Sequence, residues 1–530
     1  MKNKHMLLGD EAIALAAIHS GISASYSYPG TPSTEIVETI QREVKQDPDL
    51  GVICAWSINE KVAMEEACGA SMIGKRSLAT MKHVGLNVAA DPFMNMAMTG
   101  TSGGLVICVA DDPSMHSSQN EQDSRFFSEF AKILCLEPVD SQECYDMTTQ
   151  AFDLSEKFKT PVMIRLTTRV AHSRTGVTLS DNKQDKKPLT LPTDFTSWTL
   201  LPCNARPQYL ALLEKQKEFQ KYANAYELNE VNIVAGTQKG VVVGGLAYPY
   251  FKECLSELAV SHVRVCTYPI PEEKIKKLIN SVEELYVIEE GYPLIENQLY
   301  RLMHETGKMI TLHGRQDGTF PFAGELTPDV VRKGFGLDTK EESSYPVSSL
   351  VKGRPPQLCK GCPHADTYNA LNEVLKGHEQ ERLVFSDIGC YTLGAYPPYE
   401  AIHSCVCMGA SVSMAKAAGE NGLKYSVAVL GDSTFEHSGI TPLLEGVSKK
   451  VPFTVIILDN AKIAMTGGQE RIMSEEQFMP FILGTGIDPK HVRLINPLPK
   501  NHEENVQIIR EECAYEGPSV IVARRKCIQK

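Results

Sequence analysis

Short apolar runs alternate with helical patterns along the first 180 residues of the chain. The runs GLVICVADD (104–112) and TPVMIRLTTR (160–169) have the length and composition of buried strands. Buried strands that alternate with helices build parallel sheets. The pattern therefore predicts a parallel α/β domain over residues 1–180.

Two further blocks follow a polar stretch. Residues 181–235 carry several prolines and a charged run, which predicts a linker and an exposed helix. Residues 236–345 read as strand, glycine turn, helix and buried strand, and residues 346–530 form a third α/β block. Its predicted strands are 383–389, 425–432, 453–460 and 518–524.

Composition narrows the class of protein. With 42% hydrophobic and 22% charged residues the chain is an ordinary globular protein. A net charge of -12 argues against binding to nucleic acid or to an acidic membrane. No apolar run approaches the roughly 20 residues that span a bilayer, and residues 1–21 read as an amphipathic segment with Asp10 and Glu11 rather than the apolar region of a signal peptide. We expect a cytoplasmic protein, and in that compartment the 15 cysteines should stay reduced. Most of the cysteines, such as Cys108 and Cys266, should be small core residues.

Two strand ends in the third block carry hard oxygen ligands. Asp432 follows one predicted strand, and Asn460 ends the next, 29 positions further on. Parallel strands joined by a helix bring their carboxyl ends to the same edge of a sheet, where such oxygens suit Mg²⁺ and a diphosphate. Gly431 would let the diphosphate approach the backbone. The intervening helix should present Ile440, Leu443, Leu444 and Val447 on one face.

The same segment resembles the thiamine diphosphate motif, GDG followed by NN. Ser433 stands in place of the last glycine and Asp459 in place of the first asparagine. The resemblance implies that Asp432, the side chain of Asn460 and the backbone carbonyl of Lys462 bind Mg²⁺, with Gly431, Ser433 and Thr434 at the cofactor. The alternative is that GDS only turns a strand and DN only caps a loop.

Thiamine chemistry also needs a proton acceptor, because C2 of the cofactor must be deprotonated. The segment SINEKVAMEEACGAS (57–71) resembles the region where these enzymes carry the glutamate that contacts the pyrimidine ring. Glu60 is thus the candidate catalytic residue. The alternative is an exposed glutamate in a helix's first turn, stabilised by the helix dipole.

Two further segments resemble cofactor-binding stretches of related enzymes. In IHSCVCMGASVSMAKAAG (402–419), Met408 would support the bent cofactor and the Val406 carbonyl would accept from its amino group. DIGCYTLG (387–394) would bring Gly389 to the diphosphate. The alternative for Met408 is a simple core methionine.

The resemblance extends to one family of thiamine enzymes. YSYPGTPSTE (26–35) resembles the YPITPSTE signature of pyruvate and related ferredoxin oxidoreductases, in which the threonine matching Thr31 contacts substrate. KHVGLNVAADP (82–92), DDPSMHSSQNEQDSR (111–125) and LDNAKIAMTGGQE (458–470) are similar to the large subunit of the indolepyruvate branch. The similarity covers essentially the whole chain, but the branch's usual terminal ferredoxin module would be missing.

Membership implies a fold of three parallel-sheet α/β domains of the transketolase and pyruvate ferredoxin oxidoreductase type. Residues 1–180 would bind the pyrimidine, 236–345 would be the transketolase C-terminal-like domain, and 346–530 would bind diphosphate and Mg²⁺. Met465, where the pyruvate enzymes carry asparagine, favours an aromatic side chain on the 2-oxoacid, with a branched aliphatic side chain as the alternative. Lys82, His83 and His437 are candidate polar contacts, although solvated or core roles are equally compatible with the sequence.

Four cysteines match the order in which related enzymes bind a 4Fe-4S cluster. They are a CxxC pair, one cysteine in an IGC turn and one near the chain's end. Zinc, a redox dithiol and purely structural thiols compete with this interpretation. The four are Cys359, Cys362, Cys390 and Cys527.

The resemblance implies oxidative decarboxylation of an arylpyruvate, with coenzyme A as acyl acceptor and ferredoxin as electron acceptor. It also implies a small γ-type subunit and a dimer of large chains. A second interpretation keeps the thiamine site without the redox step, as a decarboxylase or carboligase. A third is a cofactor-binding subunit without catalysis, against which Glu60, Asp432 and Asn460 argue.

Overall fold

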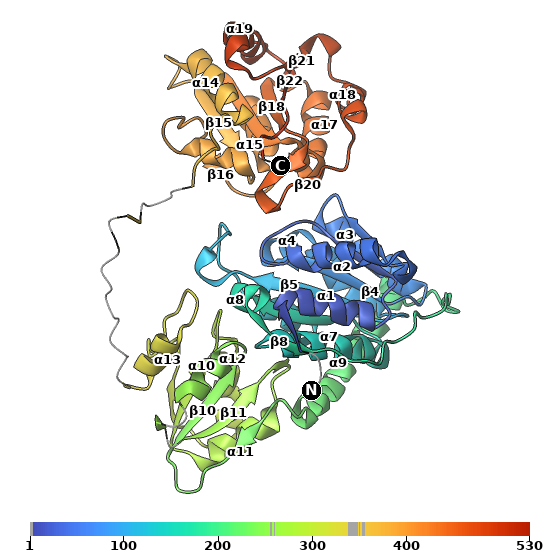
Figure 1. Ribbon diagram of the computed structural model, residues 1–530, viewed down its shortest axis with the longest axis vertical. Helices are drawn as coiled ribbons and strands as arrows, with labels where there is room; N and C mark the ends of the chain where they lie inside the picture. The colour runs from blue at the N-terminus through green and yellow to red at the C-terminus, as the bar shows by residue number, and fades with distance from the viewer. Residues whose placement is uncertain are drawn as a thin grey trace. The chain divides into compact units, whose positions relative to one another are not determined.

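The computed structural model describes residues 4–254, 257–258, 260–337, 348, 350–351 and 356–529. The chain forms two compact units, residues 1–346 and 347–530, drawn from blue to yellow and from orange to red in Figure 1. The predicted domain boundary between residues 345 and 346 lies outside the described residues. Both units are built on parallel strands with helices between them, which confirms the predicted α/β class.

A seven-stranded sheet lies at the centre of the first unit, in the order β12-β6-β7-β5-β4-β2-β3. All neighbours are parallel except β12, which runs antiparallel to β6. Successive residues of β4 enter two different cores, Leu78 on one face and Ala79 on the other, so helices cover both faces. The strands are β2 (Ala24–Ser27), β3 (Ile53–Trp56), β4 (Ser77–Lys82), β5 (Leu105–Asp111), β6 (Leu134–Leu136), β7 (Val162–Thr167) and β12 (Thr267–Tyr268).

The helices of this sheet divide between its faces. Side chains of α1, α2 and α7 join the core that contains Leu78, whereas α3 and α5 join the core that contains Ala79. These helices are α1 (Gly9–His19), α2 (Thr34–Gln46), α3 (Glu60–Met72), α5 (Ala90–Thr99) and α7 (Ser141–Phe158).

The first helix differs from the sequence prediction. An amphipathic α1 would leave one face in water, but only Glu11 and Leu15 of its residues are not buried. The reason is that α2 and α7 pack against α1 while its alanines fit closely over the sheet. The prediction of an amphipathic segment was therefore wrong, and Asp10 lies in the interior.

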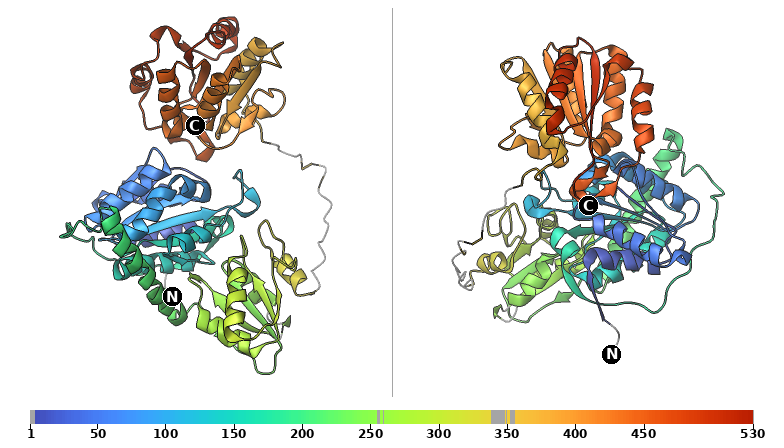
Figure 2. Two further views of the ribbon diagram at one scale, coloured as in Figure 1. Left: turned by 180° about the vertical axis from the view of Figure 1, so that it is seen from behind. Right: turned by 45° about the horizontal axis from the view of Figure 1, so that its top comes forward.

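The charged helix predicted between the blocks is α9 (Pro202–Ala225). Most of its surface is exposed, but Leu212, Phe219 and Ala223 are buried. It contacts α5 and α11 (Glu272–Ser281) and is drawn as the long green helix in Figure 2.

A second sheet completes the first unit, in the order β14-β13-β10-β11-β9. Its central strands are parallel and almost wholly buried. The strands are β9 (Val231–Asn232), β10 (Lys239–Gly244), β11 (Ser261–Val265), β13 (Glu284–Ile288) and β14 (Thr311–His313), and the remaining helices include α10 (Ala247–Cys254), α12 (Leu294–Thr306) and α13 (Pro328–Gly334).

The second unit contains a fully parallel six-stranded sheet in the order β16-β15-β17-β18-β22-β21. On α17 (Ile440–Lys449), Leu443 is buried but Leu444 is 43% exposed, so the expected four-residue apolar face was wrong at Leu444, which turns outward. The strands are β15 (Arg382–Ser386), β16 (Ser404–Cys405), β17 (Tyr425–Gly431), β18 (Phe453–Asp459), β21 (Val492–Ile495) and β22 (Pro518–Arg524), and the helices include α14 (Pro363–Leu375), α15 (Ala410–Glu420), α18 (Glu475–Gly484) and α19 (His502–Cys513).

Over the described part of the chain, no helix combines the length and the apolar character needed to cross a membrane.

Candidate functional site

Four strand ends of the first unit bring polar residues to one edge of the seven-stranded sheet. The neighbouring strands β3, β2, β4 and β5 end at Trp56, Ser27, Lys82 and Asp111. Carboxyl ends of parallel strands are where α/β sheets carry their ligand sites. Thr31, Glu60, Lys82 and His83 all lie in the segments that leave this edge, as do Asp112 and Ser117, which the sequence did not single out.

Glu60 is the first residue of α3, and Asn59 caps the helix by accepting a hydrogen bond from Val62 N–H at 2.9 Å. The side chain of Glu60 is only 6% exposed, so the alternative of an exposed first-turn glutamate was wrong. It lies directly over Gly85, where an added Cβ would come within 2.6 Å of Glu60 Cγ. The glycine therefore makes room for the carboxyl.

Lys82 lies between two carboxylates at this edge. Burial lowers the pKa of Lys82 to about 8, while the charges of Asp112 and Glu60 act in the opposite direction. Its ammonium donates to the Ser117 carbonyl at 3.2 Å, and the Ser117 hydroxyl donates to the Thr31 carbonyl at 3.2 Å. The cation and the predicted substrate-contacting loop thus share one hydrogen-bonded segment.

His83 is buried beside Lys82. Its Nε2 lies 3.3 Å from Asn120 Oδ1 and it is 1% exposed. Burial lowers its pKa, which favours the neutral imidazole.

In the second unit the two predicted metal ligands meet at adjacent strand ends. Ala461 N–H donates to Asp432 Oδ2 at 2.8 Å, and Ser433 N–H donates to Oδ1 at 2.9 Å. Asn460 is buried, and its Oδ1 accepts from Lys462 N–H at 2.9 Å. The geometry brings Asp432, Asn460 and Lys462 into one tight turn.

Two partly buried arginines, which sequence reasoning missed, adjoin this turn. Arg471 donates to Asp459 Oδ1 at 2.8 Å and lies 3.6 Å from Asp432 Oδ2, while Arg524 donates to Asp459 Oδ2 at 2.6 Å. Burial, followed by the charge of Asp459, raises the pKa of Asp432 to about 7, and Arg471 opposes this shift. The signal in the sequence was the unusual Asp459 in place of asparagine, since a buried carboxylate requires cationic partners.

The hydroxyl of Ser433 is buried and has no hydrogen-bonding partner. Burying such a group without a partner costs free energy, so it marks a place where a polar ligand would complete the donor set. Thr434 lies beside it and donates to the Ile388 carbonyl at 3.3 Å. The residues present fit a diphosphate with its metal ion.

Asp387 directly follows β15 and was not singled out from the sequence. It accepts from the Tyr391 hydroxyl, from Ser411 Oγ at 2.6 Å and from Gly409 N–H at 3.1 Å. Burial raises its pKa to about 6 against the effect of these hydrogen bonds. Through them it fixes the turn that contains Gly389.

The segment before α15 presents the predicted cofactor contacts. Val406 is 54% exposed, Met408 is partly buried, and Gly409 has φ of +83°, with an added Cβ 2.5 Å from Ser438 Cβ. Only glycine fits there, so Met408 is held at a fixed place on the helix start. His437 is buried beside this segment and contacts Ser438 Oγ at 2.6 Å.

The four candidate cluster cysteines lie within electrostatic reach of one another. Burial, followed by the neighbouring thiols of Cys362, Cys527 and Cys359, raises the pKa of Cys390 to about 11. Cys527 N–H donates to the Asn460 carbonyl at 3.1 Å, which joins the cysteine group to the metal-ligand turn. As predicted, Cys108 and Cys266 are buried core residues.

Comparison with protein families agrees with this geometry. The family described as pyruvate flavodoxin/ferredoxin oxidoreductase, thiamine diP-bdg matches residues 15–225. The family described as thiamine pyrophosphate enzyme, C-terminal TPP binding domain matches residues 387–523. The two edges with the candidate residues fall in these two matched regions.

Individual proteins extend the match to the whole chain. Indolepyruvate oxidoreductase subunit IorA of Methanothermobacter marburgensis is 36% identical over 543 residues, which cover 98% of this chain and 86% of that protein. The same subunit of Archaeoglobus fulgidus is 36% identical over 557 residues, with 99% and 86% covered. A 2-oxoglutarate:ferredoxin oxidoreductase structure from Magnetococcus marinus, 17% identical, matches with a TM-score of 0.50 over 62% of this chain and 64% of that one, which supports the fold.

These matches confirm the resemblance seen in the sequence. Since relatives of 36% identity align along nearly all of its length, the chain belongs to the indolepyruvate oxidoreductase IorA family, within the thiamine-diphosphate-dependent 2-oxoacid:ferredoxin oxidoreductases.

Proposed function

We propose that this chain is the thiamine-binding subunit of an enzyme that oxidatively decarboxylates an aryl 2-oxoacid such as indolepyruvate. The product is the acyl-CoA, and the electrons pass to ferredoxin. One observation carries the proposal: full-length similarity to indolepyruvate oxidoreductase subunits coincides with buried, correctly spaced candidate residues at both sheet edges.

Thiamine diphosphate, when bound, supplies a nucleophilic carbon that adds to a 2-oxo group and stores the electron pair left by decarboxylation. Asp432, the Asn460 side chain and the Lys462 carbonyl would hold Mg²⁺. Gly431, Ser433 and Thr434 would receive the diphosphate. The donor set of carboxylate, amide and carbonyl oxygens is the one that Mg²⁺ prefers.

Glu60 would hold the proton at the pyrimidine end. Its side chain is 6% exposed and lies over Gly85, where a carboxyl group could share a proton with a ring nitrogen. The Val406 carbonyl would accept from the amino group, Met408 would support the bent shape, and Gly389 would allow the diphosphate to pass close to the backbone.

The substrate carboxylate would meet Lys82 and Thr31. A partly desolvated ammonium attracts a carboxylate more strongly than a solvated one does. Met465, in the loop after the metal ligands, would contact the aryl side chain, because a thioether adapts to large apolar groups. The carboxylate is common to all 2-oxoacids, so the Met465 assignment alone favours indolepyruvate-like over small 2-oxoacids.

Electrons would leave through a 4Fe-4S cluster on Cys359, Cys362, Cys390 and Cys527. The charges of Cys362, Cys527 and Cys359 act on Cys390, which supports one shared site for the four thiols. In a 4Fe-4S cluster each cysteine would bind a different iron atom.

The subunit name of the relatives supports a partner chain. We propose that a small γ-type subunit completes the enzyme, with coenzyme A and ferredoxin as further partners and a dimer of the large chains. Residues 1–180 would form the pyrimidine domain, 181–235 the linker and helix, 236–345 a transketolase C-terminal-like domain and 346–530 the diphosphate domain.

The test is an anaerobic assay of the chain purified with its partner subunit. Viologen reduction is measured with coenzyme A and either pyruvate, 2-oxoisovalerate, phenylpyruvate or indolepyruvate. We expect reduction that requires thiamine diphosphate and is fastest with the arylpyruvates. Aldehyde release without viologen reduction, or a preference for pyruvate, would contradict the proposal.

A further inference from the structure

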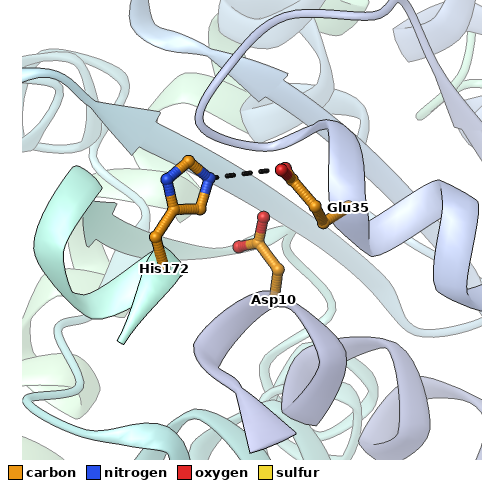
Figure 3. Close-up of side chains that lie close together, drawn as sticks. All are labelled: Asp10, Glu35 and His172. Carbon is orange, nitrogen blue, oxygen red and sulfur yellow. Dashed lines mark ion pairs between the residues drawn. The ribbon is translucent and has the colours of Figure 1, made fainter. Parts of the chain in front are cut away.

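Three metal-ligating side chains from distant parts of the chain meet in the first unit, beside the loop that contains Thr31. Asp10 comes from the start of α1, Glu35 from the start of α2 and His172 from the end of α8 (Thr168–His172). Their ligand atoms all lie within 4.8 Å of one another, and Figure 3 shows the two carboxylates and the imidazole turned toward a common point.

Asp10 is the member that demands an explanation. It is 0% exposed, and neither of its carboxylate oxygens has a hydrogen-bonding partner. Burial, followed by repulsion from Glu35, raises its pKa well above the usual range. A buried carboxylate facing a second carboxylate is unfavourable unless a cation or a proton lies between them.

The separation of His172 and Glu35 is compatible with a shared cation. His172 Nε2 and Glu35 Oε2 form an ion pair at 3.4 Å, drawn as a dashed line in Figure 3, and neither atom makes a hydrogen bond. Hydrogen bonds of this kind measure about 2.7–3.2 Å. Two ligands of a tetrahedral ion with bonds of about 2.1 Å are separated by about 3.4 Å.

We propose that Asp10, Glu35 and His172 bind one divalent transition-metal ion of the Zn²⁺ class. One imidazole nitrogen and two carboxylate oxygens form a three-residue set that leaves one tetrahedral position for water. The two negative charges balance the ion, and a neutral imidazole completes the set. The side chains of His172 and Glu35 are 33% and 35% exposed, so the ion reaches the site from solvent.

The position in the fold indicates what the ion would do. It would join the starts of α1 and α2 to α8, which follows β7. Helix α2 begins directly after the loop that contains Thr31, and Gly30 N–H donates to Thr34 Oγ1 at 3.0 Å at that junction. The ion would therefore stabilise the loop through the start of α2 and would not contact the residues assigned to catalysis.

Cobalt(II) is the probe that separates this site from the others. The holoenzyme, saturated with thiamine diphosphate and excess Mg²⁺, is freed of loosely bound metal ions with any iron-sulfur cluster left intact. It is then titrated with Co²⁺ alone, and each spectrum is recorded as the difference from the cobalt-free sample. Nitrogen and oxygen ligands in a four-coordinate site give visible ligand-field bands, whereas binding to the cysteine group adds a sulfur charge-transfer band in the near ultraviolet. Melting temperature is measured in parallel.

We expect one Co²⁺ with visible bands and no sulfur band in the wild type, and a rise in melting temperature on binding. Asp10→Asn and His172→Gln should each weaken that site at least about tenfold, since even outer-shell changes cost 10–100-fold. Glu11→Gln removes the same charge one residue away and should bind like the wild type.

Two results would overturn the proposal. One is the absence of a sulfur-free Co²⁺ site in the wild type, which would leave a shared proton between Asp10 and Glu35. The other is unchanged affinity in Asp10→Asn or His172→Gln. Because His172 is partly exposed, its variant gives an answer even if the buried Asp10→Asn protein does not fold.

Discussion

The backbone N–H of Ala461 donates to Asp432 Oδ2 at 2.8 Å and so joins the ends of β17 and β18. Ala461 has a positive φ of 60°, a conformation that a non-glycine residue adopts at a cost of about 1 kcal/mol or more. The turn places Asn460, whose Oδ1 accepts from Lys462 N–H, directly before the residue that donates to this carboxylate. Local strain of this kind is typical of ligand sites rather than of simple strand-to-loop connections.

Removal of either predicted metal ligand should weaken cofactor binding. Asp432→Asn and Asn460→Ala should each raise the dissociation constant of thiamine diphosphate at fixed Mg²⁺ by at least about tenfold. Isothermal titration calorimetry measures the change. Glu445→Gln, on the exposed side of α17 in the same unit, is the control and should bind the cofactor normally. Unchanged affinity in Asp432→Asn would refute the assignment.

A methyl group at Gly85 should displace Glu60. The new Cβ would lie 2.6 Å from Glu60 Cγ, so Gly85→Ala should lower the free energy of unfolding by about 0.5–3 kcal/mol and reduce turnover. Gly69→Ala in α3 has no atom within 4 Å of the added carbon and should stabilise the protein by about 0.5–1 kcal/mol. Chemical denaturation compares the two variants, and a stabilised Gly85→Ala protein would contradict the packing described.

The Michaelis constant for the 2-oxoacid should depend on the charge of Lys82. Burial lowers the pKa of Lys82 to about 8. The side chain is therefore a charged ammonium below pH 8, and this charge is lost as the pH rises through that value. The Michaelis constant should therefore increase above pH 8. Lys82→Met should raise it at all pH values and flatten the profile. Lys61→Met, which removes an exposed lysine paired with Glu65, should keep the wild-type profile.

The cysteine group should determine iron content and electron transfer. Cys362→Ser and Cys390→Ser should lose iron and viologen reduction together, while thiamine diphosphate still binds. Cys203→Ser, at an exposed position in α9, should retain both. Zinc in place of iron in the anaerobically purified wild type would contradict the electron path proposed here.

Several features of the second unit follow from sequence logic alone. The strands at Tyr425–Gly431 and Phe453–Asp459 begin and end within a residue of their predicted bounds, because continuous apolar runs bounded by Gly-Asp and Asp-Asn leave few alternatives. The convergence of Asp432 and Asn460 follows from parallel pairing. Glu60 at the first position of α3 follows from the capping Asn59.

Other features depend on tertiary contacts that local patterns do not contain. The burial of α1 on all sides is decided by α2 and α7, which pack over a helix rich in alanine. The pairing of Asp459 with Arg471 and Arg524 joins residues 12 and 65 positions away. The meeting of Asp10, Glu35 and His172 likewise requires three helices that no sequence periodicity brings together.

Exchange of the C2 proton of bound thiamine diphosphate with solvent deuterium tests the central claim most directly, that Glu60 activates a cofactor anchored at Asp432 and Asn460. Quenched-flow proton NMR measures its rate in the wild type and in Glu60→Gln under cofactor saturation. We predict that Glu60→Gln slows exchange by about 10²–10⁴-fold while the cofactor remains bound. An exchange rate equal to that of the wild type would show that Glu60 does not act on the cofactor.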